Sequence, residues 1–497
     1  MTMPATRTVG ARRQGRAAGA AIVCICCLTM FVIAVDTTVV NLALPLIGRG
    51  LHASVAGLQW TIAAYTITTA SLMLTSGSIG DRFGRRTVLQ VGLAVFTFAS
   101  VGCGLAPSVG WLIAFRALQG AAGSTLTPMA MGILTATFTD PAARARAIGA
   151  WSGTFGIGMA IGPALGGALA AAWGWRSLFW INIVPGLIAI IAAGLAIPAQ
   201  RPARARRLDP LGQVLVIAVL ACLTYGIIEG PADGWRSAPI VMAFACSAAA
   251  LALLLPWEHR RAEPLIELRV FRSIPFSGAL VITLCSFACL GGLLFLTTLY
   301  LQDVHGLTVL QAGLQLLPIA AATAIAGPLA GRTMASRGPR IPLIFSGVAF
   351  TASCLALAYA GAAPPWLLLA LAYAIFGAGY GAVNIVISAV AIAGMPRAQA
   401  GVAGGITSAG RQAGQSLGVS VIGAILAGRL HGTVRAGFDA ASHPAWLVIA
   451  AFGVAVLLLS VVSTSGRALR TAALVAGPAT DPAPVTSGAA ALRGSGD

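Results

Sequence analysis

Apolar runs of eighteen or more residues recur along this 497-residue chain from one end to the other. A helix rises ~1.5 Å per residue and the hydrocarbon core of a bilayer is about 30 Å thick, so each run can cross a membrane as a helix. The composition agrees, because only 9% of the residues are charged, whereas a soluble domain carries roughly 25%. The sequence therefore predicts an all-α polytopic membrane protein. It does not favour a β-barrel, whose strands alternate apolar and polar residues over about ten positions.

The apolar runs divide into fourteen predicted transmembrane helices. Their ranges are 19–45, 56–79, 87–107, 110–135, 147–171, 177–198, 211–229, 238–256, 275–301, 311–331, 341–362, 365–394, 402–428 and 445–466. All 31 basic residues are arginine, and 24 of them lie in the two termini and the even-numbered loops. The opposite loops hold Arg49, Arg176, Arg236, Arg429 and Arg435. Because arginine concentrates on the cytoplasmic side of a membrane, both termini are predicted to be cytoplasmic. The net charge of +18 is thus a topology signal, and we expect no nucleic-acid partner.

A weak internal repeat indicates how the helices are grouped. Residues 141–167 match residues 396–422 in the spacing of proline and glycine, as in Pro141 with Pro396 and Gly149 with Gly404. Parallel repeats of this kind occur in transporters. The predicted divisions are a basic cytoplasmic N-terminus 1–18, a six-helix bundle 19–198, a linker with two inserted helices 199–256, a cytoplasmic connector 257–274, a second six-helix bundle 275–466 and a disordered cytoplasmic tail 467–497.

The first predicted helix contains one ionisable side chain, Asp36, within the string VDTTVVNLALP at residues 35–45. A carboxylate inside a membrane is costly and marks a functional site by default. Burial favours the neutral form of a carboxyl group, so Asp36 is the candidate for proton coupling. The fourth helix contains Arg116, with Gln119 and Gly120 on the same face. Arg116 is the candidate partner of Asp36, and the alternative is that it extends to the membrane interface.

The loop after the second helix reads GSIGDRFGRR, residues 77–86. Its glycines permit a tight turn, and Asp81 among three arginines suggests an ion-pair network that breaks and re-forms between two conformations. The alternative is an ordinary basic loop with a solvated aspartate. The predicted cytoplasmic gate consists of Gly77, Asp81, Arg82, Gly84, Arg85 and Arg86.

The fifth predicted helix is rich in glycine and contains a proline. The residues concerned are Gly149, Gly158, Gly162, Pro163, Gly166 and Gly167. Proline disfavours a straight helix, and glycines let a neighbouring helix approach closely. This combination predicts a kinked, closely packed helix that acts as a hinge or seal. The alternative is ordinary packing of small residues.

Signals for other sites are weaker. The candidate lining of a substrate cavity is Asn41, Trp60, Tyr65, Tyr300, Tyr380 and Arg411, although aromatic residues near helix ends often anchor a protein at the membrane interface. The nine cysteines lie in apolar runs without metal-binding spacing, and the five histidines lie in loops without a catalytic pattern. We therefore expect no metal, no cofactor and no enzymatic activity.

Several of these motifs resemble one known family. GSIGDRFGRR, with Ile79 where leucine is usual, is similar to the loop 2–3 signature of the major facilitator superfamily. Arg116 with Gln119 and Gly120 resembles its span 4 signature, and the glycines and proline of the fifth helix resemble the motif of its antiporters. The strings VDTTVVNLALP, QWTIAAYTIT (59–68) and WGWRSLFWINIVPG (173–186), together with Arg411, resemble the fourteen-span drug:proton antiporter branch. The resemblance covers residues 20–466.

The resemblance implies two six-helix bundles plus two inserted helices, alternating access, and export driven by inward proton flow. We therefore expect a monomeric, proton-coupled antiporter in the inner (plasma) membrane of a bacterium. Its partners would be protons, the lipid bilayer and a small-molecule substrate, such as a hydrophobic or amphipathic drug or antibiotic. The alternative is an exporter of an endogenous metabolite: a siderophore, an amino acid, a lipid precursor or a self-made antibiotic. In the second bundle Gly331-Arg332 stand where Asp81-Arg82 stand in the first, which departs from exact repetition.

Overall fold

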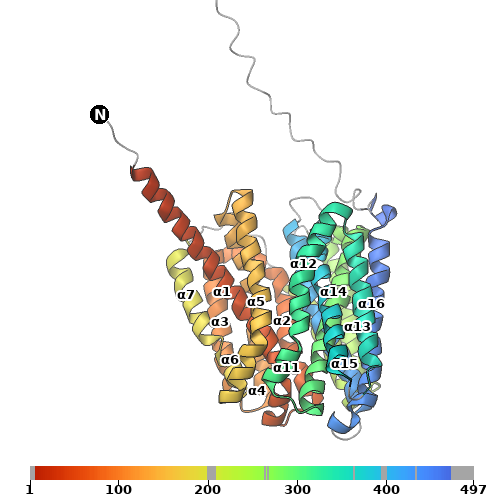
Figure 1. The fold of residues 1–497 in the computed structure, drawn as a ribbon. Coiled ribbons are helices and arrows are strands. Elements are labelled where there is room, and N and C mark those ends of the chain that lie inside the picture. The colour runs from red at the N-terminus through yellow and green to blue at the C-terminus, as the bar shows by residue number, and fades with distance from the viewer. Residues whose placement is uncertain are drawn as a thin grey trace, which may run out of the picture.

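A computed structural model describes residues 6–198, 209–261, 265, 268–361, 364–392, 400–430, 434–468 and 470–471. Every regular element within these ranges is helical, as the sequence predicted. Ten of the described helices are long and apolar enough to cross a membrane, or eleven if one bent helix is counted as a single span. The protein is therefore a multi-pass membrane protein (Figure 1).

The first half of the chain forms seven helices. They are α1 (Thr6–Leu51), α2 (Val55–Phe83), α3 (Arg85–Leu105), α4 (Val109–Thr137), α5 (Pro141–Trp173), α6 (Ser177–Trp180) and α7 (Ile183–Ala196). Two further helices follow, α8 (Pro210–Asp233) and α9 (Ala238–Arg260). In Figure 1 the first half lies on the left, in red to yellow, and the rest of the chain lies beside it on the right.

The second half begins with a short 3₁₀ helix, η1 (Leu268–Arg272). The remaining elements are α10 (Ile274–Leu299), the π-helix η2 (Tyr300–Val304), α11 (Val309–Gln315), α12 (Leu317–Arg337), α13 (Arg340–Ala358), α14 (Trp366–Ile392), α15 (Ala400–Arg429) and α16 (Val434–Ser463).

Local sequence signals explain where several helices begin. Ser54 and Asp140 accept hydrogen bonds from backbone N–H groups in the first turns of α2 and α5. Thr308 and Gln311 form a reciprocal capping box at the start of α11. Such caps satisfy N–H groups that have no partner within the helix. Gly84 separates α2 from α3 with a φ of 87°, which only glycine adopts without strain.

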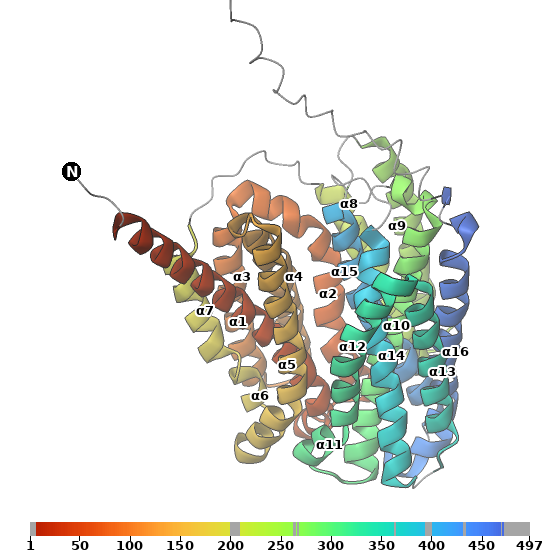
Figure 2. The ribbon, with the colours of Figure 1, turned by 45° about the horizontal axis from the view of Figure 1, so that its top comes forward.

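The helix contacts of the first half recur in the second half. In the first half α1 packs on α5 and α7, α2 packs on α4, and α3 packs on α4 and α7. In the second half α10 packs on α15 and α16, α12 packs on α14, and α13 packs on α14 and α16. These contacts are equivalent when the six long helices of each half are taken in chain order, so both halves have one packing scheme. The helices α8 and α9 lie outside this scheme, and α8 packs on α2 and α15 (Figure 2).

The two halves are joined most extensively at one end of the bundle, where α1 ends and η2 lies. We call this the closed end. There Gln302 donates to the carbonyl oxygen of Leu42 at 2.7 Å, and Arg49 forms a 2.7 Å ion pair with Asp303. Gly313 of α11 also packs against Pro163 of α5. Both halves therefore meet in polar and apolar contacts at this end.

Contacts are sparse on one face of α5 and α15 toward the opposite end. A Cβ atom built on Gly149, Gly153 or Gly156 of α5 would have no neighbour within 4 Å, and the same holds for Gly404 and Gly405 of α15. In Figure 1 the upper parts of α5 and α12 diverge, whereas α11 lies beside α5 below. The close contacts of α5 with α11 therefore lie toward the closed end.

The helices differ from the predicted spans in some respects. The basic segment 1–18 was predicted as a separate terminus, but α1 already begins at Thr6, because its alanine, arginine and glutamine residues favour a helix. The bent helix is α5, in which Pro141–Met159 and Ile161–Trp173 enclose an angle of 41°. Proline clashes with the carbonyl group four residues earlier, which places the cause at Pro163. Much of the predicted connector and nearly all of the predicted tail lie outside the described residues.

Candidate functional site

Asp36 lies in the middle of α1 and its side chain is fully buried. Its Oδ2 atom accepts a 2.7 Å hydrogen bond from Nη1 of Arg116 on α4, and the two groups form an ion pair. Its Oδ1 atom accepts hydrogen bonds of 2.9 Å from Nε2 of Gln119 and from Nδ2 of Asn182. Three donors therefore stabilise the charged form of one carboxylate inside the membrane-spanning part of the protein.

Arg116 is held by more than its acidic partner. Its Nε donates to the carbonyl oxygen of Thr61 at 3.2 Å, and Nη1 also donates to Oε1 of Gln119 at 2.6 Å. The guanidinium carbon lies 4.4 Å from the ring centre of Tyr65, a cation–π distance. A buried guanidinium requires such compensation for its lost hydration. Arg116 thus lies inside the helix bundle, and it does not extend to the interface.

Gln119 connects the ion pair to α3. Its Nε2 donates both to Asp36 and to the hydroxyl oxygen of Ser100, each at 2.9 Å. One amide forms hydrogen bonds with Asp36, Arg116 and Ser100. It therefore links α1, α3 and α4 in a single hydrogen-bond network.

Asn182 is the member of this cluster that sequence reasoning missed. It stands between α6 and α7 and is almost completely buried. Two signals were available: Asn182 is a single amide within an apolar run, and it lies in the string WGWRSLFWINIVPG (173–186) that resembles the fourteen-span branch. Buried amides need partners, but the sequence does not indicate that the partner is a carboxylate 146 residues away.

The candidate proton-coupling residues Asp36 and Arg116 are therefore brought together with Gln119 and Asn182. Protonation of the carboxylate would remove one charge of a buried pair and leave Arg116 without its counter-charge. The lost interaction is large where water is excluded. The cluster thus places one ionisable group where three helices and the α6–α7 junction meet.

The glycines of α5 pack on α1 beside this cluster. A Cβ atom on Gly158 would lie 2.6 Å from Cβ of Ala34, and one on Gly162 would lie 3.1 Å from Cβ of Thr38. A Cβ atom on Gly166 would lie 3.0 Å from Cγ2 of Val39. The three contacts lie on either side of Asp36 in α1, so α5 touches the segment that carries the buried acid.

The remaining residues of the predicted α5 motif lie elsewhere. A Cβ atom on Gly167 would meet the backbone of Leu310 in α11, and Pro163 lies against Gly313 of the same helix. These two residues therefore belong to the contact between the halves. Gly149 has no neighbour within 4 Å.

The predicted gate residues lie at the junction of α2 and α3. Asp81 and Arg85 form a 3.3 Å ion pair, with side chains 46% and 34% exposed. Arg85 also donates to the carbonyl oxygen of Gly132 on α4 at 2.8 Å, and Arg86 donates to that of Gly194 on α7 at 2.6 Å. Arg86 thus caps the last turn of α7, and Arg85 connects the loop to α4. Gly77 has open space beside it, and Arg82 lies over the ring of its neighbour Phe83.

The candidate cavity residues of the first half are found at separate places. Trp60 faces the inserted helix α8, where its Nε1 donates to Oε1 of Glu229 at 2.7 Å. Tyr65 lies against Arg116 and belongs to the buried cluster. Asn41 donates to the carbonyl oxygen of Thr37 within α1.

The candidate cavity residues of the second half are also separated. Arg411 donates to Oγ of Ser388, and its guanidinium carbon lies 5.7 Å from the ring centre of Phe287. Tyr380 packs on the same ring, at 5.5 Å between centroids. Within the described residues Arg411 has no acidic partner. Tyr300 lies at the closed end, in η2.

Comparison with known sequences identifies relatives. Residues 26–419 match the family model of the Major Facilitator Superfamily. The chain is 34% identical over 409 residues to the multidrug resistance protein Stp of Mycobacterium tuberculosis (strain CDC 1551 / Oshkosh), which covers 82% of this chain and 76% of that protein. It is 36% identical over 403 residues to the tetracenomycin C resistance and export protein of Streptomyces glaucescens, which covers 81% of this chain and 74% of that protein.

Comparison with solved structures gives the same fold. A bacterial homolog of the human lysosomal transporter Spinster, in an inward-facing and unoccupied conformation, matches with a TM-score of 0.66 at 18% identity. The match covers 93% of this chain and 99% of that chain. Together with the family model and the sequence relatives, it shows that the chain belongs to the major facilitator superfamily of membrane transporters.

Proposed function

We propose that this protein is a proton-coupled antiporter that exports hydrophobic or amphipathic drugs or antibiotics across a bacterial plasma membrane. The relatives named for multidrug resistance and for tetracenomycin C resistance and export support drug export. They favour this function over export of a siderophore, an amino acid or a lipid precursor. Export of a self-made antibiotic is a special case of the same function.

The observation that carries proton coupling is the buried ion pair of Asp36 and Arg116. Protonation would neutralise Asp36 and weaken its bonds to Arg116, Gln119 and Asn182. One elementary charge moved through 100 mV is worth about 2.3 kcal/mol, which supports a concentration ratio of ~50 at 1.4 kcal/mol per tenfold. One proton per substrate is therefore sufficient for useful export.

The proposed topology has fourteen transmembrane helices with both termini in the cytoplasm. It comprises two six-helix bundles, 19–198 and 275–466, with α8 and α9 inserted between them. The uneven distribution of arginine supports this orientation. Three of the proposed transmembrane helices, α2, α4 and α15, are less apolar than the helices that qualify as membrane spans by composition. They are the three that contain Gln59, Arg116 and Arg411, and polar residues in a membrane face the interior of a bundle.

In this orientation the closed end faces outward and the structure represents an inward-facing state. Transport would then require the contacts of Gln302 with Leu42 and of Arg49 with Asp303 to break. At the opposite end the halves would close, with Asp81 and Arg85 near the new contact. Alternating access of this kind needs a single chain only, so the protein is proposed to act as a monomer.

The test is substrate-driven proton movement in proteoliposomes loaded with a pH-sensitive dye. Addition of an exported drug to wild-type protein should change the internal pH, and Asp36→Asn should abolish the change. Asp233→Asn, at the exposed end of α8, serves as the matched control and should behave as wild type. Full proton coupling in Asp36→Asn would refute the role of Asp36.

A further inference from the structure

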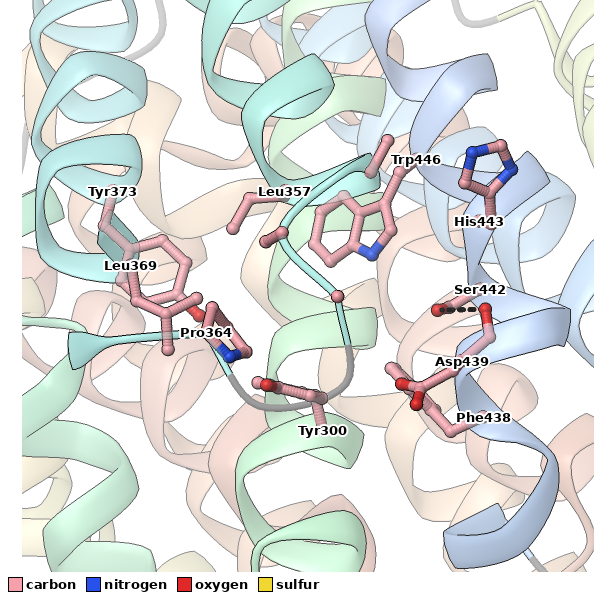
Figure 3. Close-up of a pocket in the computed structure, with 13 residues that line it drawn as sticks. Tyr300, Leu357, Pro364, Leu369, Tyr373, Phe438, Asp439, Ser442, His443 and Trp446 are labelled. Carbon is pink, nitrogen blue, oxygen red and sulfur yellow. Dashed lines mark hydrogen bonds between the residues drawn. The ribbon is translucent and has the colours of Figure 1, made fainter. Parts of the chain in front are cut away.

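A pocket of about 110 Å³ opens at the closed end of the second half, away from the buried ion pair. All its lining residues come from η2, α13, α14, α16 and the segment between α13 and α14. Figure 3 shows Tyr300, Trp446 and Asp439 around the same space, with Tyr373 and Phe438 beside them. No residue of the first half lines it, so it is a separate feature from the Asp36 cluster.

The lining is aromatic and contains one acid. The rings of Tyr300 and Phe438 lie 5.6 Å apart with a 32° angle between their planes. Tyr373 and Trp446 complete the aromatic part, and both are largely buried. The faces of aromatic rings are negative and attract organic cations, quaternary ammonium groups above all. Neutral apolar ligands would need no such arrangement.

Asp439 adds a full negative charge to this lining. It is exposed to solvent, and its carboxylate forms no ion pair among the described residues, although Arg435 lies one helical turn away. The remaining titratable groups around the pocket are Tyr300, Tyr373 and His443, and the ring of His443 packs on Tyr359. The lining thus includes an unpaired carboxylate and no lysine or arginine.

The pocket is also connected to the contact between the halves. Tyr300 is the first residue of the π-helix η2, whose next residues include Gln302 and Asp303. These two side chains bond Leu42 and Arg49 of α1. Short π-helical turns are frequent at functional sites. A ligand that packs on Tyr300 therefore contacts the element that holds the closed end together.

We propose that this pocket is a binding site for a small organic cation, with Tyr300, Phe438 and Trp446 around its apolar groups and Asp439 as its counter-charge. Because the ligand packs on η2 as it stands in this conformation, binding favours the closed end. The site lies apart from the Asp36 cluster, and its assignment does not depend on the proposed drug export.

The first test compares two ligands of equal shape by calorimetry on the purified full-length protein. Choline has a quaternary nitrogen where its isostere 3,3-dimethylbutan-1-ol has a neutral carbon. We expect choline to bind at least tenfold more tightly than the alcohol. Equal affinities, or no binding of choline, would overturn the proposal.

Variants locate the site. Asp439→Asn should weaken choline binding at least fivefold, whereas Asp233→Asn should leave it unchanged. Tyr300→Phe keeps the ring and should bind as wild type, and Tyr300→Leu should lose binding at an unchanged melting temperature. An unaffected Asp439→Asn, or equal losses in Asp439→Asn and Asp233→Asn, would contradict the assignment.

The link to the closed end has its own readout, hydrogen exchange of the backbone amides in residues 300–304. Choline should slow this exchange in the wild type and leave it unchanged in Asp439→Asn. Exchange that choline does not alter in the wild type would show that occupancy and the closed end are independent, against the proposal.

Discussion

Asp36 and Arg116 form an ion pair of 2.7 Å between α1 and α4, with side chains 0% and 2% exposed. Removing two charges from water costs several kcal/mol per ion, and the pair alone repays this only with good geometry and further hydrogen bonds. Here Gln119, Asn182, Tyr65 and the carbonyl of Thr61 supply those further contacts. The arrangement is costly to build, which fits the proposed role of Asp36 in proton coupling.

Asp36 and Arg116 should contribute to the free energy of unfolding as a coupled pair. Asp36→Asn or Arg116→Gln alone leaves one buried charge or its donors uncompensated, and each should destabilise the protein by ~3–5 kcal/mol. The double variant removes both charges and should lose less than the sum of the two single losses. Chemical unfolding in mixed micelles measures all four proteins of this cycle. Additive losses would mean that the two side chains do not interact.

Asn182 should support transport through its hydrogen bond to the buried carboxylate. Asn182→Leu removes one of the three donors to Asp36 and leaves only Arg116 and Gln119. Drug-driven proton movement should therefore fall severalfold. The measurement is the change of internal pH in proteoliposomes during drug transport.

The matched control for Asn182 is Gln90→Leu. Gln90 also loses an amide hydrogen bond, from its Nε2 to the carbonyl oxygen of Ile190, but it does not touch Asp36. Its drug-driven proton movement should stay close to that of the wild type. Equal losses in both variants would show that Asn182 acts only through general packing.

The fold could be predicted from the sequence because the membrane imposes simple rules on composition. The length of the apolar runs predicted the all-α fold class. Pro163 predicted a kinked helix, and α5 is bent by 41°. The repeat of Pro141 and Gly149 at Pro396 and Gly404 indicated two similar halves, whose helix contacts recur. The number of spans is not decided in this way, since α2, α4 and α15 contain polar residues that lower their hydropathy. The cytoplasmic position of the two termini also stays a prediction.

The site could be predicted in part. Asp36 and Arg116 were recognisable because charges inside apolar runs need partners. The direction in which each side chain points could not be predicted, because packing against neighbouring helices sets how a helix is rotated about its own axis. Trp60 was a candidate for a substrate cavity, yet it bonds Glu229 of an inserted helix. Asn182 lies in the string 173–186 that resembles the fourteen-span branch, but its bond to Asp36 was missed because one amide in an apolar run gives no indication of its partner.

The contact between α5 and α11 should tolerate no added methyl group at position 167. A Cβ atom there would lie 2.4 Å from Cα of Leu310, and backbone cannot move aside as a flexible side chain can. Gly167→Ala should therefore separate the halves at the closed end and reduce transport severalfold. Transport rates in vesicles and hydrogen exchange of residues 309–315 provide the measurements.

The control for Gly167 lies on the same helix. Gly153 has no neighbour within 4 Å, so Gly153→Ala adds only a better helix former, worth roughly 0.5–1 kcal/mol of stability. Its transport should match the wild type. If Gly167→Ala also behaves as wild type, the close approach of α5 and α11 is not required for function.

The ion pair of Arg49 and Asp303 should supply only a small part of the free energy that stabilises the closed end. The two side chains are 60% and 20% exposed, and such a pair is worth about 1 kcal/mol at most. Arg49→Glu places two like charges together and should speed hydrogen exchange of residues 300–304 by about fivefold, which is 1 kcal/mol at 1.4 kcal/mol per tenfold. Asp303→Arg should do the same, and the double reversal should restore the wild-type rate because it rebuilds the pair in the opposite sense.

At 1 M salt the Debye length falls to about 3 Å, so the differences in exchange rate between the variants should shrink. A double reversal that exchanges as fast as either single variant would show that the charges do not act on each other, and that other contacts between the halves, such as those of Gln302 and Gln59, hold the closed end.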